Sequence, residues 1–117
     1  MWLNLQNTAG TFTSQTFDAG AGKSADLKSL YWTDASTDPE LKFQVAVNED
    51  NATWKYVGPD GNEGSYFTTP GQAITAQAPI KGRYVRYRAY FASDTDTLTK
   101  TPVLKSVIMG YTVVDLI

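Results

Sequence analysis

The stretch GRYVRYRAYF, residues 82–91, decides the fold class of this chain. Successive side chains of a β-strand point to opposite sides, so the stretch divides into two faces. The residues expected in the core are Val85, Tyr87, Ala89 and Phe91. The other face is an outward stripe of cationic and aromatic residues, namely Tyr84, Arg86, Arg88 and Tyr90. The pattern predicts a long central strand, with Arg83 forming an edge salt bridge at its entrance.

Short extended segments separated by turn-forming residues make up the rest of the chain. The clearest alternation is LKFQVAVN, from Leu41 to Asn48, and the strongest turn signal is GPDG, residues 58–61. Extended segments are expected at 11–17, 27–32, 41–48, 53–57, 66–69, 83–91 and 103–114, with a further short one at 73–76. We expect Trp32 and Trp54 to face inward and Gly110 to mark a bulge. About eight strands at this spacing predict an all-β, antiparallel β-sandwich or jelly roll.

Length and composition exclude several classes of protein. A chain of 117 residues with 42% hydrophobic residues is expected to form one domain with a single core. Its formal net charge of −2 argues against nucleic-acid binding, and no apolar run is long enough to predict insertion into a membrane. It has no histidine and no cysteine, which removes Ser-His, Cys-His and His-metal chemistry. Carboxylate-based catalysis is the one enzymatic route left, but Glu40, Glu49 and Glu63 are all expected in turns and a sandwich of this size has little room for a deep cleft. We therefore predict a protein that is not an enzyme.

The order of motifs along the chain resembles a known kind of module. The motifs are Ser14 to Gly20 (Ser14, Phe17, Asp18, Gly20), WKYVGPDG at 54–61, RYVRY at 83–87 and PVL at 102–104. Together they resemble the galactose-binding-like, discoidin-type jelly rolls of large bacterial and archaeal surface proteins. The resemblance spans roughly residues 10–112, leaving 1–9 and 113–117 as terminal strands or flanks. It implies an accessory domain at the cell surface or outside the cell, for adhesion or carbohydrate contact.

Two groups of residues are candidates for ligand binding. Aromatic rings stack on sugars, and guanidinium groups hydrogen-bond to hydroxyls or carboxylates, so the stripe of Tyr84, Arg86, Arg88 and Tyr90 suits a glycan or a surface protein. The alternative for this stripe is an exposed sheet face whose arginines pair across strands. The second group is Tyr66 and Phe67, which follow a glycine-containing turn and are expected to be exposed.

One acidic turn could hold a metal ion. Asp60, Asn62 and Glu63 form an oxygen-rich segment, and Ca²⁺ takes carboxylate, amide and carbonyl oxygens. The alternative is an ordinary turn, because Asp and Asn side chains commonly bond to their own backbone. Apart from a structural calcium ion, we expect no cofactor.

The two ends of the chain support a second hypothesis. The chain begins MWLNL and ends VVDLI, so both ends hold apolar residues that could pair with another copy as unpaired strand edges. Trp2 is the candidate interface residue. The sequence thus leaves two hypotheses open: a carbohydrate-binding or adhesion module, and a structural or spacer unit of a surface layer, fibre or virion.

Overall fold

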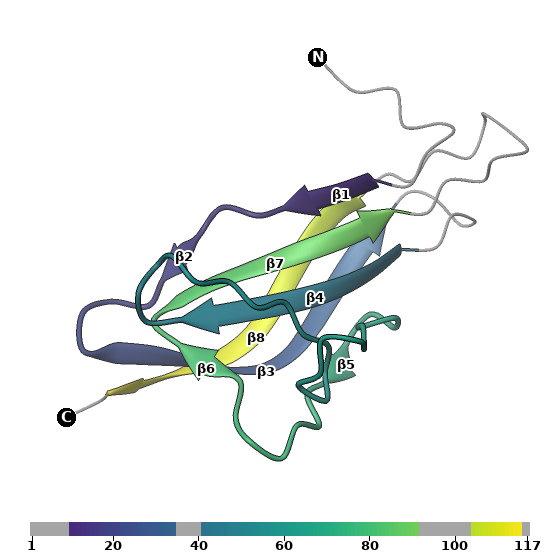
Figure 1. The fold of residues 1–117 in the computed structure, drawn as a ribbon. Helices are drawn as coiled ribbons and strands as arrows, with labels where there is room; N and C mark the ends of the chain where they lie inside the picture. The colour runs from purple at the N-terminus through teal and green to yellow at the C-terminus, as the bar shows by residue number, and fades with distance from the viewer. Residues whose placement is uncertain (1–9, 35–40, 92–103, 116–117) are drawn as a thin grey trace, which may run out of the picture.

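The protein is an all-β sandwich of two antiparallel sheets, as the sequence predicts (Figure 1). The computed structural model describes residues 10–34, 41–91 and 104–115. These residues form eight strands and no helix: β1 (Gly10–Thr13), β2 (Phe17–Asp18), β3 (Lys23–Asp34), β4 (Leu41–Asn48), β5 (Gln72–Ala73), β6 (Lys81–Gly82), β7 (Tyr84–Phe91) and β8 (Leu104–Asp115). Within these ranges no helix offers the length and apolar character that a membrane span needs.

β7 is the central strand of the first sheet. It pairs with β4 along its whole length, from Leu41 opposite Phe91 to Asn48 opposite Tyr84. Its other edge is shared by β1 and β2, which pair with its second half and its beginning respectively. The stretch that predicted a long strand in the sheet interior therefore has strands on both sides.

β3 is the corresponding centre of the second sheet. β8 pairs with it from end to end, while the two-residue strands β5 and β6 share its other edge. Its register with β8 shifts between Leu27 and Ser29, so Lys28 is an extra residue in β3 opposite Tyr111 and Gly110. The extra residue reverses the alternation of β3. Consequently Ala25 and Leu27 before the bulge and Leu30 and Trp32 after it are all buried.

The core lies between the two sheets and contains the residues with the strongest strand alternation. β4 contributes Phe43 and Val45, and β7 contributes Val85 and Ala89, each at most 2% exposed. Trp32 packs against Phe43 with 4.3 Å between ring centroids, which joins the two sheets. Tyr87 is half-buried and packs against this cluster. The side chain of Phe91 lies outside the described part of the structure.

One side of the sandwich leaves apolar side chains exposed. There β1 and β2 border the first sheet and β8 borders the second. Phe17 and Tyr111 meet across this border with 5.2 Å between ring centroids, yet they are 43% and 42% exposed. Beneath them a hollow of about 200 Å³ extends between the sheets to Leu27 and Met109. We call this border the open side.

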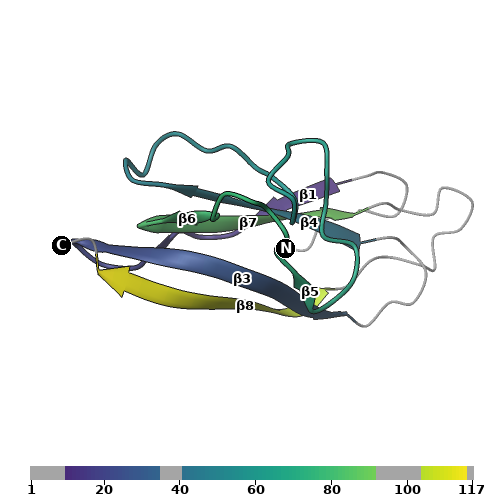
Figure 2. The same ribbon diagram turned by 90° about the horizontal axis from the view of Figure 1, so that it is seen from below.

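The connection from β4 to β5 lies against the first sheet on the side away from the core. Viewed edge-on, β4 and β7 form one layer, β3 and β8 form the other, and the teal segment after β4 lies outside the first (Figure 2). Only two of its residues bridge to the outer edge of β4: Val57 pairs with Val45, and Phe67 with Phe43. The hairpin strand expected at 53–57 and the strand expected at 66–69 are therefore single bridges.

Candidate functional site

The outward stripe of β7 lies on the surface of the first sheet that faces away from the core, as its alternation predicts. This stripe is partly covered by other side chains. Its four residues are all half-buried, namely Tyr84, Arg86, Arg88 and Tyr90. Aromatic side chains of the β4–β5 connection lie against Arg86, Arg88 and Tyr90, whereas Arg83 lies over Tyr84. We call the combined surface the cation–aromatic face, which consists of Lys42, Trp54, Tyr56, Tyr66, Arg86, Arg88 and Tyr90.

The bridge at Val57 explains how the aromatic residues reach this face. Val57 points into the core, so Trp54 and Tyr56 take positions that project to the opposite side. The Arg86 guanidinium carbon lies 4.2 Å from the centroid of the Trp54 ring, and that of Arg88 lies 3.8 Å from Tyr56. Both distances are typical of favourable cation–π contacts.

Threonines of the neighbouring strand region hold the two arginines on their other side. Arg86 Nε donates to Thr16 Oγ1 at 2.8 Å, and Arg88 Nε donates to Thr13 Oγ1 at 3.0 Å. Each guanidinium is thus fixed between a ring of the β4–β5 connection and a hydroxyl at the β1–β2 edge. Fixed guanidinium groups lose less side-chain entropy when they bind a ligand.

A second part of the cation–aromatic face is built around Tyr66 and Tyr90. Their rings meet edge to face with centroids 5.3 Å apart, and Lys42 Nζ lies 4.0 Å from the centroid of Tyr66. Tyr90 Oη donates to Gln44 Oε1 at 2.5 Å. Gln44 is 3% exposed, and its Nε2 donates to the backbone oxygens of Glu63 and Ser65 at 2.8 and 2.9 Å. This buried amide ties the β4–β5 connection to the sheet beneath it.

Two aromatic residues lie on the opposite side from the one expected. Phe67 is not an exposed ligand-binding residue: it is 0% exposed, because its bridge to Phe43 directs its side chain into the core. Trp54 is not a core residue. The bridge at Val57 places the Val57 side chain in the core, so Trp54, three residues earlier, faces the opposite side. Trp32, which sits in the regular part of β3, is buried as predicted.

The acidic turn of Asp60, Asn62 and Glu63 has the geometry of an ordinary turn. Asp60 Oδ1 accepts a hydrogen bond from the backbone N of Asn62 at 3.0 Å and another from the Ser65 hydroxyl. The Ser65 hydrogen bond, followed by that from Asn62, lowers the pKa of Asp60. In the part of the chain that the structure describes, no three acidic side chains gather as metal ligands. The turn therefore gives no support to a calcium site.

Asp18 and Arg83 form the edge salt bridge that the sequence predicts for Arg83. Arg83 Nε and Nη2 donate to the two carboxylate oxygens of Asp18 at 2.8 and 3.1 Å. Asp18 Oδ1 also accepts from the backbone N of Gly20 at 2.8 Å, which defines the turn after β2. Arg83 lowers the pKa of Asp18, and Asp18 raises the pKa of Arg83.

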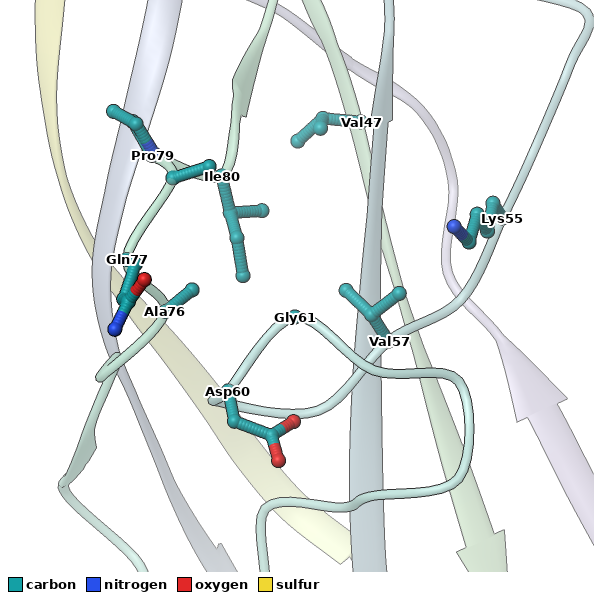
Figure 3. Close-up of a pocket in the computed structure, with 10 residues that line it drawn as sticks. Val47, Lys55, Val57, Asp60, Gly61, Ala76, Gln77, Pro79 and Ile80 are labelled. Carbon is teal, nitrogen blue, oxygen red and sulfur yellow. The ribbon is translucent and has the colours of Figure 1, made fainter.

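A shallow hollow of about 490 Å³ lies between the β4–β5 connection and residues 76–80 (Figure 3). Val57 and Ile80 point into it from opposite sides, and Lys55 stands at its rim. The Asp60 carboxylate beside it is engaged by its own turn. Lys55 and Gln77 are its other polar lining residues, and none of its lining residues has an aromatic ring on which a sugar could stack. The cation–aromatic face is the stronger candidate site.

Comparison with known proteins adds no relative. No protein-family model, curated protein or solved structure matches the chain. The resemblance to galactose-binding-like modules therefore stays a prediction. The candidate interface residue Trp2 lies outside the described residues.

Proposed function

We propose that this domain is a non-catalytic carbohydrate-binding module and that the cation–aromatic face is its binding surface. One observation carries the proposal: Trp54, Tyr56 and Tyr66 each hold a cationic side chain against their ring, in one continuous row over β4 and β7. Such a row combines flat apolar surface with directed hydrogen-bond donors, the two features that a pyranose ring requires. Its position on a sheet surface suits an extended sugar chain.

A glycan array with purified wild-type protein and three variants tests this function. We expect wild-type binding to a group of related glycans, and loss of that signal in Arg88→Ala and Tyr66→Ala. Lys81→Ala is the matched control, because Lys81 is an exposed cation in β6, on the other sheet. Equal melting temperatures would show that the variants remain folded. Absence of any glycan signal for the wild-type protein would refute the proposal.

The open side favours a second candidate function, an assembly unit that pairs with another copy of itself. β8 is twelve residues long, and no described residue pairs with its outer edge. From Ser106 to Val114 it carries no charge and no proline, the devices that usually protect such an edge. Ile108, Tyr111 and Val113 are 59%, 42% and 46% exposed. Antiparallel pairing of two β8 strands would bring these residues against the second copy. Because residues 106–114 carry no charge, this pairing would place no like charges opposite each other.

Light scattering over a range of protein concentrations tests the second candidate. We expect a dimer that Val113→Lys dissociates, because a charge facing inward at a sheet edge opposes pairing. Thr75→Lys, an exposed substitution in the β5–β6 connection, is the control and should leave the dimer intact. A wild-type protein that stays monomeric at high concentration would exclude assembly through β8.

A further inference from the structure

We infer that the ligand of the cation–aromatic face is acidic: a polysaccharide that carries carboxylate or sulfate groups. This inference rests on the proposed carbohydrate-binding function and narrows it to one chemical class. It follows from the charge, the hydrogen-bond partners and the spacing of the cationic side chains on this face.

Within the described residues, the three cations of the cation–aromatic face have no acidic partner, whereas Lys23, Lys28 and Arg83 have one. Elsewhere in the described residues three ion pairs form: Lys23 with Asp115, Lys28 with Asp26 and Arg83 with Asp18. Within those same residues, Lys42, Arg86 and Arg88 have no carboxylate within ion-pair distance. Among the described residues, the positive charge of this surface is thus not compensated, although the chain as a whole has more acidic than basic residues, 12 against 10. Charge complementarity favours an anion there.

The hydrogen-bond donors of the two arginines point to the same conclusion. An arginine has five N–H donors, and here a threonine accepts only from Nε of each. The terminal nitrogens have no partner among the described residues. They form the fork that matches a carboxylate or sulfate with two parallel hydrogen bonds, which are stronger than hydrogen bonds to neutral hydroxyls. The contacts with Trp54 and Tyr56, together with the threonine hydrogen bonds, hold these forks in place before a ligand binds.

The spacing of the cations suits a ligand with repeated negative charges. Arg86 and Arg88 are two residues apart on one face of β7, which separates their backbones by about 7 Å. Lys42 continues the row, because it lies opposite Tyr90 in the register of β4 and β7. An acidic sugar chain laid along β7 could place successive anionic groups against these side chains, with its rings beside Tyr66 and Tyr90.

Calorimetric titration with matched ligand pairs tests this inference. The first pair is an oligogalacturonate and the same oligosaccharide with its carboxylates methyl-esterified; the second is sulfated dextran and dextran. We expect the acidic member of at least one pair to bind about tenfold or more tightly, with affinity falling as salt rises. Arg88→Lys keeps the charge but removes the fork, so it should weaken acidic binding severalfold. Lys81→Ala should leave it unchanged.

Each other outcome has a definite meaning. Equal affinity for the acidic and neutral members would overturn the acidic ligand while leaving carbohydrate binding in place. No binding to any sugar, on the array or by calorimetry, would overturn the proposed function itself. A third outcome is that single-stranded DNA of matched charge competes as well as the acidic sugar does. This would overturn the polysaccharide assignment, because the face would then bind any polyanion of that charge.

Discussion

The Arg88 guanidinium carbon lies 3.8 Å from the centroid of the Tyr56 ring. The same side chain donates from Nε to Thr13, so a residue of central strand β7 connects β1 to the β4–β5 connection. Arg86 makes the equivalent link between Thr16 and Trp54. These two arginines therefore hold together three segments that are far apart in sequence, and their terminal nitrogens have no partner among the described residues.

Removing the hydroxyl of Tyr56 should not destabilise the protein. This oxygen is buried and has no hydrogen-bond partner in the described part of the chain, whereas the ring carries the contact with Arg88. Tyr56→Phe should therefore keep the free energy of unfolding or raise it by up to about 1 kcal/mol, because a buried unpaired hydroxyl is unfavourable. Urea unfolding measures the difference. A loss of more than that amount would mean that the hydroxyl has a partner in solution.

Replacing Gln44 should loosen the β4–β5 connection. The side chain makes hydrogen bonds to Glu63, Ser65 and Tyr90 in a buried position. Gln44→Leu leaves those partners without a hydrogen bond, so we expect the free energy of unfolding to fall by about 2–3 kcal/mol.

A second substitution at this position separates hydrogen bonding from packing. Gln44→Glu has almost the same shape, but at neutral pH its carboxylate cannot donate to the two carbonyl oxygens. It should be destabilised at least as strongly as Gln44→Leu in the same urea experiment. A glutamate variant with wild-type stability would show that these hydrogen bonds contribute little.

Two glycines should respond differently to an added methyl group. A Cβ at Gly82 would lie 2.8 Å from the backbone N and 2.9 Å from the backbone O of Asn48, where the chain crosses from β6 to β7 beside the end of β4. Gly82→Ala should lower the free energy of unfolding by about 1–3 kcal/mol, because backbone atoms must move to make room for the methyl group. A Cβ at Gly110 meets the Ser29 hydroxyl at 2.6 Å, and that hydroxyl can rotate away. Thermal unfolding should therefore show a large loss only for Gly82→Ala; equal losses would contradict the close approach at Asn48.

The Asp18–Arg83 pair should make stability depend on pH in the acid range. Arg83 lowers the pKa of Asp18 in the folded protein below the ordinary value of about 3.9. A carboxyl group with a lowered folded pKa stabilises the protein above its unfolded pKa, and this stabilisation disappears as pH falls through the folded pKa. Asp18→Asn should therefore be less stable than wild type at pH 6, and the gap should narrow below about pH 4. Unfolding at both pH values measures the gap; a constant gap would exclude this linkage.

Regular strands could be predicted from the sequence because their alternation is local. Leu41 to Asn48 is β4 with the predicted bounds, and Val85, Tyr87 and Ala89 of β7 face the core as predicted. In both strands apolar residues occupy every second position, and only Ala46 adds an apolar residue to the other face of β4. Only one orientation of each strand places its apolar residues in the core, so the sequence pattern was enough to predict it.

Irregular segments could not be predicted in this way because a single bridge decides which side a residue faces. Trp54 and Phe67 lie in a connection whose backbone bridges to β4 only at Val57 and at Phe67 itself. No repeating pattern in the sequence specifies those two bridges. The bulge in β3 is a similar case, because only the pairing with β8 shows that Lys28 is an extra residue. Gly110, which lies opposite this bulge, did indicate an irregularity in this pair of strands.

A two-dimensional ¹H–¹⁵N NMR titration with the oligogalacturonate tests the central claim most directly, because it locates the ligand on the protein. We predict that the side-chain N–H signals of Trp54, Arg86 and Arg88 shift together with backbone amides of β4 and β7. The amides of β8 and those of residues 76–80, on the far side of the hollow, should stay in place. Shifts confined to β8 or to the hollow between Val57 and Ile80, or no shifts at all, would contradict the assignment of the cation–aromatic face as the binding surface.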